Sequence, residues 1–290
     1  MPAKPPTAAP MQIDSAAKRL LFSTVRVDTE LEDGTAGSGT AFIITHRHAR
    51  GSTPFIVTNR HLVEGVRRGG LIFTQMREGR PDFGRRFQLN IDDFPAAWFY
   101  HPDAQTDLAI IPLRPLERAA RDLGVALYYH SIDSGTIPDA AQIRDFDALE
   151  EILFVGYPSG IWDQVNLMPI LRRGTTATPL ELDFEGRKQF LVDAAVYPGS
   201  SGSPVFVVRD DPLRARAAGA RTIWFVGVVA AVFFRQEQNH IVSAPIPASQ
   251  GNCATVTEMI DLGLILKAES VRELADGFVK RWLDSERATA

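Results

Sequence analysis

Ser201 is the residue of this sequence best placed to do chemistry. It stands in Tyr197-Pro198-Gly199-Ser200-Ser201-Gly202-Ser203-Pro204-Val205-Phe206, close to two glycines and just before an apolar run. Glycines favour a tight loop and the apolar run favours a strand, so the pattern predicts a hydroxyl presented on a loop. A serine hydroxyl is a weak nucleophile at neutral pH. Acyl chemistry therefore needs an imidazole as base and a carboxylate that orients the imidazole.

Two further stretches supply the base and the carboxylate. Residues 55–63 form a β-branched run that leads to His61, and residues 105–113 begin another apolar strand with Asp107. The order along the chain is therefore histidine, aspartate, serine. These residue types predict nucleophilic catalysis by Ser201, with His61 as general base and Asp107 as its orienting group.

The three stretches together resemble the trypsin-like (chymotrypsin-fold) serine peptidases. Residues 193–202, Asp-Ala-Ala-Val-Tyr-Pro-Gly-Ser-Ser-Gly, are most similar to the disulfide-free, bacterial-type HtrA/Deg branch. The resemblance covers nearly the whole chain. It implies a serine endopeptidase that cleaves peptide bonds in proteins through an acyl-enzyme. No PDZ segment is recognisable after the predicted barrels, which departs from typical HtrA/Deg proteins.

The resemblance also implies a set of binding residues. The backbone N–H groups of Gly199 and Ser201 would form the oxyanion hole. The position six residues before the nucleophile places Ala195 at the base of the primary pocket, and a later strand places Ala230 and Val232 in its wall. This uncharged, narrowed pocket predicts a small or medium aliphatic residue before the scissile bond (P1), such as Ala, Val or Leu.

The mechanism implied by the resemblance needs no metal and no organic cofactor. The expected partner is a protein or peptide substrate, and a regulatory protein partner stays open. An α/β-hydrolase would also carry a serine between glycines, but Ser203 stands where its motif has glycine and only His240 lies downstream as a base. The alternative that the sequence leaves open is a catalytically inactive trypsin-fold module that binds peptides or regulates another protein.

Composition limits the other classes of function. The chain has 290 residues, of which 45% are hydrophobic, and a formal net charge of −4. This length allows sizeable cores, and the charge gives no electrostatic footprint for nucleic acid. The basic pairs Arg67-Arg68, Arg85-Arg86 and Arg172-Arg173 are predicted to be solvated or to form salt bridges.

Cysteine usage and the N-terminus indicate the compartment. Cys253 is the single cysteine, which cannot form a disulfide within a monomer and is predicted to be inert. Residues 1–11 are proline-rich and predicted to be a disordered tail without an apolar leader segment. No charge-free apolar run reaches the length of a membrane span. We therefore expect a cytoplasmic protein without a membrane partner.

The strand-like segments predict an all-β fold with minor helices. The expected architecture is two packed six-stranded antiparallel β-barrels of the chymotrypsin type, followed by a C-terminal helix. His61 and Asp107 would come from the first barrel and Ser201 from the second. His46 and His48 are assigned to a polar hairpin loop, 46–51, as solvated residues rather than metal ligands. The predicted division is 1–11 disordered tail, 12–118 first barrel with a short N-terminal helix, 119–149 interdomain connection, 150–267 second barrel, and 268–290 C-terminal helix and tail.

Overall fold

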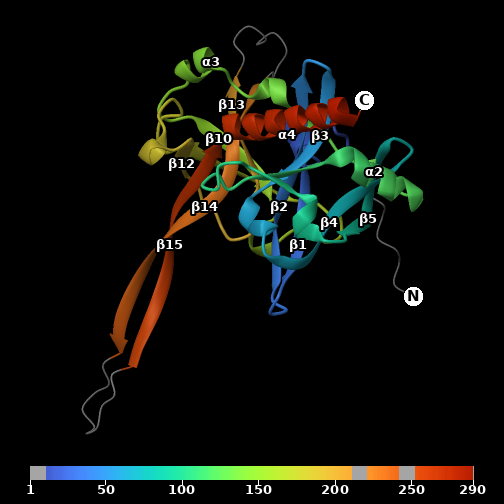
Figure 1. Cartoon of the computed structure of the whole chain (residues 1–290). Coiled ribbons are helices and arrows are strands. Elements are labelled where there is room, and N and C mark those ends of the chain that lie inside the picture. Colours follow the sequence, from blue (N-terminus) through green and yellow to red (C-terminus); the bar gives the residue numbers. More distant parts are fainter. Residues whose placement is uncertain (1–10, 211–220, 242–251, 290) are drawn as a thin grey trace.

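The computed structural model of the chain describes residues 11–210, 221–241 and 252–289. Figure 1 shows two β-rich halves with helix α4 (Ala268–Thr289) lying across them. The predicted β-rich architecture with minor helices and a C-terminal helix is confirmed. The predicted N-terminal helix is also present as α1 (Ala16–Leu20), where the side chain of Ser15 accepts a hydrogen bond from the backbone N–H of Lys18.

The first half is a nine-stranded sheet. Its hydrogen-bonded order is β5-β4-β1-β2-β3-β7-β6, with β8 paired to β4 and β9 paired in parallel to β2. Val25 and Val27 of β1 are buried while Arg26 and Asp28 between and after them are half-exposed, which is the alternation expected of a strand with one face on a core. The strands are β1 (Thr24–Leu31), β2 (Ala36–His48), β3 (Gly51–Thr58), β4 (Val66–Arg77), β5 (Arg80–Ile91), β6 (Phe99–Tyr100), β7 (Ala109–Pro112), β8 (Leu127–Tyr128) and β9 (Ile132–Asp133).

The first sheet differs in one respect from the six-stranded barrel that was predicted. The path of paired strands in the described residues is open, because β5 at one end does not pair with β6 at the other. β6 is only two residues long, so it offers few backbone groups with which to close the ring.

The second half is a closed barrel, as predicted. Its order is β10-β11-β12-β15-β14-β13, so each strand has two neighbours and the ring has no edge within the barrel. The strands are β10 (Glu151–Gly156), β11 (Ile170–Thr176), β12 (Gln189–Asp193), β13 (Pro204–Asp210), β14 (Arg221–Ile241) and β15 (Asn252–Lys267).

The predicted loop at 46–51 is wrong. β2 continues to His48 and β3 begins at Gly51, so both histidines lie in a strand. His46 is buried, and its Nε2 lies 2.8 Å from Oδ1 of Asp276 in α4. This contact attaches the C-terminal helix to the first half. Within the described residues, no group of three His, Cys, Asp or Glu side chains could hold a metal ion.

The predicted connection at 119–149 and the residues just before it contain two helices. Helix α2 (Leu113–Asp122) buries Leu113, Leu116 and Ala120, which lie on one face of the helix. Only three residues of this helix are buried, so the helix is hard to recognise in the sequence. A second helix, α3 (Ala140–Arg144), begins with a capping box between Asp139 and Gln142.

One apolar cluster joins both halves to α4. Phe55 and Leu108 come from the first half, Phe206 and Phe225 from the second, and Leu274 from the helix, and all are buried. Fully buried side chains of this size each contribute about 1.5–3 kcal/mol by the hydrophobic effect. The cluster therefore makes the relative placement of the two halves part of the folded core.

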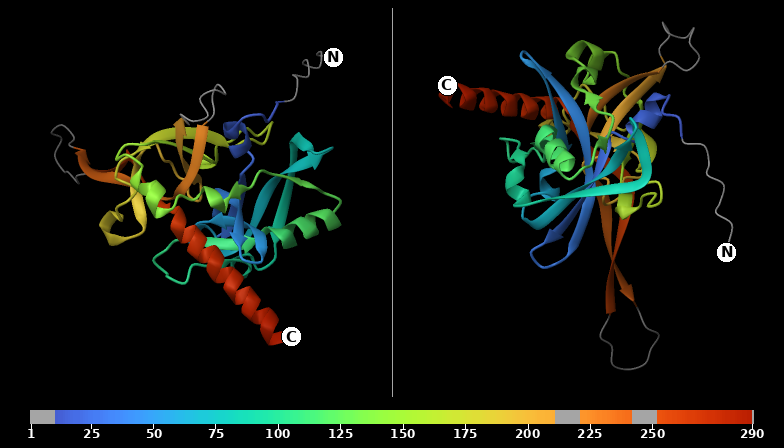
Figure 2. Two further views of the ribbon diagram at one scale, coloured as in Figure 1. Left: turned by 90° about the horizontal axis from the view of Figure 1, so that it is seen from above. Right: turned by 90° about the vertical axis from the view of Figure 1, so that its right-hand side faces the viewer.

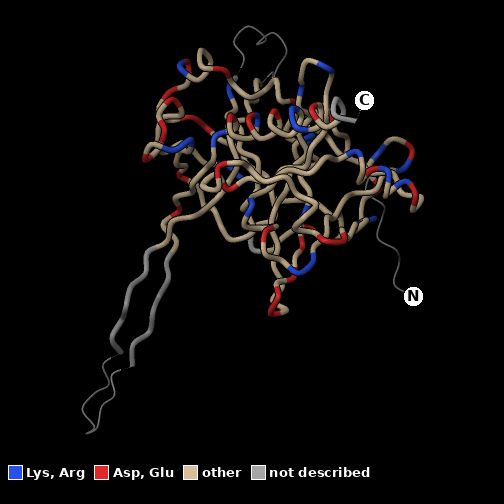
Figure 3. Tube along the Cα trace, viewed as in Figure 1, with Lys and Arg blue, Asp and Glu red and all other residues tan. Residues whose placement is uncertain are grey.

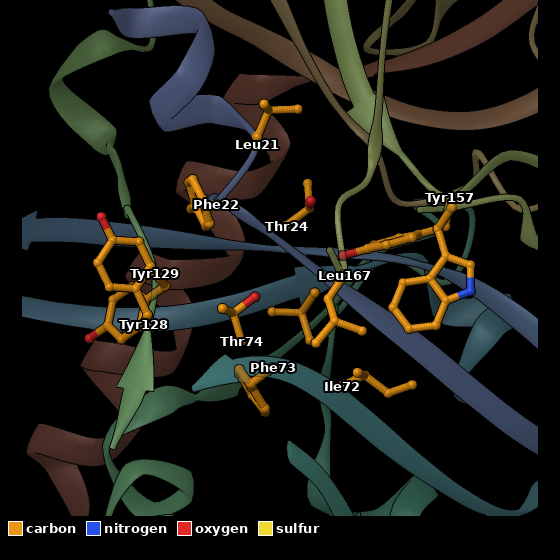
Figure 4. A pocket seen from close by; sticks show the side chains of 12 residues that line it. Leu21, Phe22, Thr24, Ile72, Phe73, Thr74, Tyr128, Tyr129, Tyr157 and Leu167 are labelled. Carbon is orange, nitrogen blue, oxygen red and sulfur yellow. The ribbon is translucent and has the colours of Figure 1, made fainter. Parts of the chain in front are cut away.

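The loop after β10 packs against the first half through aromatic side chains. Figure 4 shows Tyr157 and Leu167 from this loop facing Phe22, Thr24 and Ile72 of the first half. The space that remains between them is about 10 Å³, hardly more than one water-sized sphere. The two halves therefore meet closely on this side.

β14 and β15 extend well beyond the barrel. Apolar runs in the sequence mark strands only at 224–232 and 262–266, but the paired region reaches Ile241 and Asn252. Figures 1 and 2 show this hairpin projecting from the body of the molecule. Its outer residues are polar or alternate weakly, which is why the sequence alone did not mark them as strand.

Lys and Arg residues are interspersed with Asp and Glu residues along the described parts of the chain (Figure 3). Arg67 and Arg68 both form ion pairs with Glu30, which confirms the salt-bridge prediction for this pair. None of the helices within the described ranges is long and apolar enough to span a bilayer. Residues 1–10 of the predicted disordered tail, and the side chain of Cys253, lie outside the part of the chain that the structure describes.

Candidate active site

His61 and Asp107 are positioned by two paired strands. β3 ends at Thr58 and β7 begins at Ala109, and these residues are partners in the antiparallel ladder. The chain after β3 forms a 3-10 turn, η1 (Arg60–Leu62), that carries His61, and Asp107 precedes β7. The ladder therefore brings both side chains together at the same end of these two paired strands.

Asp107 holds His61 by two contacts. Its Oδ2 lies 2.6 Å from the ring Nδ1, and its Oδ1 accepts the backbone N–H of His61 at 2.9 Å. The backbone carbonyl of Asp107 accepts a hydrogen bond of 2.9 Å from Nδ2 of Asn59. An ionised carboxylate can only accept, so Nδ1 carries a proton and the neutral ring keeps its lone pair on Nε2. The side chain of His61 is 46% exposed, so its ring is open to a ligand.

Ser201 stands on the loop between β12 and β13. Gly199 and Gly202 of this loop have φ angles of +84° and +82°, in the left-handed region that favours glycine. A Cβ at position 202 would lie 1.8 Å from the carbonyl oxygen of Thr40. The predicted role of glycine in shaping this loop therefore has a steric cause.

Thr40, in β2, attaches this loop to the first half. Its N–H donates to the carbonyl of Ser201, and its Oγ1 donates to the carbonyl of Gly199, both at 3.0 Å. Oγ1 also accepts the N–H of Tyr157 at 3.0 Å, and the carbonyl of Thr40 accepts Oγ1 of Thr58 at 2.7 Å. Thr40 thus links the serine loop to the strand that leads to the histidine.

The structure bonds two of the three predicted residues to each other and places the third nearby. A Cβ at Gly202 would lie 2.7 Å from Oγ1 of Thr58, so the serine loop and the end of β3 adjoin. Among the described residues, no hydrogen bond joins the His61 ring to the hydroxyl of Ser201. Such contacts are often long in ligand-free enzymes and shorten when substrate binds.

Comparison with models of known protein families shows to which family the chain belongs. The model of the trypsin-like peptidase domain matches residues 39–211, more than half of the chain. The chain belongs to the trypsin-like peptidase family. His61, Asp107 and Ser201 all lie within the matched range.

Solved structures of proteases are similar to this trypsin-like peptidase. The HtrA-type protease AlgW with a tripeptide is 16% identical, with a TM-score of 0.48 over 91% of this chain. The chain spans 62% of the length of AlgW. A serine endoprotease from Yersinia pestis is 13% identical, with a TM-score of 0.48 over 94% of this chain and 68% of the other. Deg5 is 17% identical, with a TM-score of 0.43 over 74% of this chain and 81% of the other. No curated protein matches the chain in sequence.

Some backbone N–H groups in the serine loop of this trypsin-like peptidase have no partner among the described residues. In the described residues, the N–H groups of Gly199 and Ser201 make no hydrogen bond within the protein. The neighbouring N–H of Ser200 donates to Tyr197 and that of Gly202 donates to Val229, at 2.9 and 2.8 Å. The two residues predicted to form an oxyanion hole therefore both have an unpaired backbone donor, as do Ala195 and Tyr197 of the same loop.

Ser203 is accommodated by Gly156. Ser203 is fully buried, and a Cβ at Gly156 would lie 2.1 Å from its Oγ and 2.6 Å from Oγ1 of Thr40. The hydroxyl of Ser203 therefore fills space that a side chain at position 156 of β10 would occupy. Burial raises the pKa of the adjacent Tyr157 to about 12, so this phenol stays protonated at neutral pH and is no base.

The three predicted pocket residues are all half-buried. Ala195 lies between β12 and the serine loop, and Ala230 lies on β14 against the apolar cluster that joins the two halves. Val232, also on β14, packs against the core of the second barrel together with Val192 and Val196.

The sequence did not indicate that Arg172 lies beside the serine loop. It was predicted to be solvated or ion-paired, but its guanidinium lies 4.9 Å from the ring centre of Tyr197 and 5.6 Å from that of Phe154. Within the described residues it has no carboxylate partner. The cation–π contact with Tyr197 supports the residue that begins the serine loop. A basic residue that pairs with an aromatic from another strand has no signal in the sequence.

Replacing Thr40 by Val tests the link between the halves. The change removes a hydroxyl that donates to Gly199 and leaves the N–H of Tyr157 buried and unpaired, so we expect a loss of about 1–3 kcal/mol in the free energy of unfolding. Urea denaturation measures it. The control Thr35→Val, at an exposed position, should change stability by no more than about 0.5 kcal/mol. Equal effects of the two substitutions would contradict the role of Thr40.

Proposed function

We propose that this chain is a serine endopeptidase that uses His61, Asp107 and Ser201. The observation that carries the proposal is the contact of 2.6 Å between Nδ1 of His61 and Oδ2 of Asp107, beside a serine loop fixed to the same half by Thr40. Orientation of the imidazole by a carboxylate is what general-base activation of a serine requires. Membership of the trypsin-like peptidase family supports the same chemistry.

The reaction would proceed in two steps. Oγ of Ser201 attacks the peptide carbonyl carbon while its proton passes to Nε2 of His61, and the imidazolium returns that proton to the leaving amine. This leaves an acyl-enzyme ester, which water hydrolyses with the same proton transfers. Asp107 accepts from Nδ1 throughout and stabilises the charged ring. The free N–H groups of Gly199 and Ser201 would donate to the oxygen that becomes negative.

The alternative is an inactive module that binds peptides or regulates another protein. The missing hydrogen bond between His61 and Ser201 is the one observation in its favour. The chain nevertheless carries all three side chains of the proposed mechanism, and two of them are bonded to each other. The proposed substrate is a protein or peptide. Because the chain has a single cysteine and so cannot form an internal disulfide, we propose that it acts in a reducing compartment such as the cytoplasm.

Substitutions of the three residues test the mechanism. We expect Ser201→Ala, His61→Ala and Asp107→Asn each to lower kcat for a peptide substrate, the first two by about 10⁴-fold or more, while urea denaturation shows an intact fold. Because the residues act as a unit, Ser201→Ala combined with His61→Ala should be little worse than either alone. Losses that multiply in the double variant would contradict the assignment.

The proposed pocket predicts which bonds are cut. Ala195, Ala230 and Val232 carry no charge, so we propose that P1 is a small or medium aliphatic residue such as Ala, Val or Leu. An apolar pocket distinguishes such residues by only about 1–3 kcal/mol per methylene group. Sequencing the products of a randomised peptide library measures the preference. A dominant Lys, Arg or acidic P1 would show that the pocket residues are wrongly assigned, whatever the role of Ser201.

A further inference from the structure

Arg60 comes directly before His61 in the turn η1, and its side chain is held at two points. Its Nε and Nη2 donate to the two carboxylate oxygens of Glu64 at 2.8 and 2.5 Å. Its guanidinium also lies over the ring of Tyr100, with Cζ 5.1 Å from the ring centre. A guanidinium that is bound at two nitrogens and stacked on an aromatic ring keeps one position and one plane. The positive charge of Arg60 therefore has a fixed place beside His61.

Tyr100 connects this charge to the segment that carries Asp107. In the ladder of β6 and β7, Tyr100 is the partner of Ala109, which lies two residues after Asp107. The hydroxyl of Tyr100 donates to the carbonyl of Pro95 at 2.7 Å, which fixes the ring. Arg60 therefore links the turn that carries the imidazole to the strand pair that follows the carboxylate.

Arg60 and Glu64 carry opposite charges on either side of His61 in the sequence. The hydrogen bonds that Arg60 donates to Glu64 raise the pKa of Arg60, and the charges of Glu64 and Asp107 raise it further. A positive charge near an imidazole opposes its protonation, and a negative charge favours it. The two charges of the pair therefore act on the ring in opposite directions and largely cancel.

Other titratable groups lie on the elements around the ring. They are Tyr100 on β6, His101, Asp103 and Asp107 between β6 and β7, and Tyr197 in the serine loop. Burial raises the pKa of Tyr100, so this phenol is neutral at the pH at which an imidazole titrates. From Ala36 to Thr45, β2 carries no charged residue. These groups stay the same when only Arg60 or Glu64 is replaced.

We propose that Arg60 is a positioning residue whose charge, balanced by Glu64, sets the pH at which His61 takes up a proton. The proposal rests on the proposed function of His61 as general base. A base acts only in its neutral form, so this pH is the acid limit of the reaction. The simpler interpretation is an exposed ion pair that only stabilises the turn, and such a pair would leave the titration of His61 unchanged.

Titration of the His61 ring by NMR tests the proposal without relying on hydrolysis. The Ser201→Ala background prevents self-cleavage, and His61→Ala identifies the ring signal. Glu64→Gln leaves the charge of Arg60 uncompensated and should lower the midpoint by at least about 0.3 pH unit. Arg60→Met leaves the charge of Glu64 and should raise the midpoint by at least about 0.3 pH unit. The two changes combined should return it to within about 0.2 pH unit of the starting value.

Two controls separate charge from packing. Arg60→Lys keeps the charge but loses the planar fork of N–H groups, so its midpoint should stay within about 0.2 pH unit of that of the unchanged residue. Lys18→Met and Asp14→Asn remove the charges of another i,i+4 pair, in and before α1, and should not move the midpoint. Urea denaturation checks that each variant is folded.

The proposal would be overturned by shifts of the same sign in Glu64→Gln and Arg60→Met, or by shifts no larger than those of the control pair. A shift in Arg60→Lys as large as that in Arg60→Met would also overturn it. If Arg60→Met does not fold, Glu64→Gln decides alone, because the side chain of Glu64 is 50% exposed.

Hydrolysis of a peptide substrate scores the proposed function separately. In variants that retain Ser201, the acid limb of kcat/KM should move with the NMR midpoint. A protein that shows the opposite NMR shifts but cleaves no peptide keeps the charge balance at His61 and loses the proposed function. An active protein without these shifts keeps its function and loses only the role of Arg60.

Discussion

The four hydrogen bonds of Thr40 are the constraint on which the site depends. This buried residue of β2 fixes the carbonyls of Ser201 and Gly199 and accepts the N–H of Tyr157, while Thr58 donates to its own carbonyl. One residue of the first half therefore sets the position of a loop in the second. No side chain beyond hydrogen fits at position 202, because that loop approaches the carbonyl of Thr40 so closely.

Strand pairing and apolar packing also hold the two halves together around the site. The pairing of β3 with β7 brings His61 to Asp107, and the apolar cluster that includes Leu108 continues into the second barrel and α4. Leu108 follows Asp107 directly, so the carboxylate is anchored to the same core that joins the halves. The contact of His46 with Asp276 attaches α4 to the first sheet. The proposed site is therefore complete only when the two halves are packed together.

Short-range patterns in the sequence predict most of the strands and the three residues of the candidate site. The residues around Ser201, His61 and Asp107 carry motifs, and the alternating apolar runs locate most strands. Features that depend on contacts between residues far apart in the sequence were not predicted. Only three residues of α2 are buried, which is too few to mark the helix in the sequence. The burial of His46 follows from its contact with Asp276, which lies 230 residues away in the sequence. The contact of Arg172 with Tyr197 and the outer ribbon of β14 likewise depend on neighbours in space rather than on local pattern.

The proposed mechanism requires Ser201 to be a nucleophile that His61 activates. Reaction with a fluorophosphonate, followed by peptide mass spectrometry, tests it most directly, because the probe reports the reactivity of the hydroxyl without requiring the right substrate. We expect a single phosphonylated serine at position 201, and loss of the adduct when His61 is replaced by Ala in a folded protein. A folded wild-type protein that carries no adduct, or one labelled at a different serine, would contradict it.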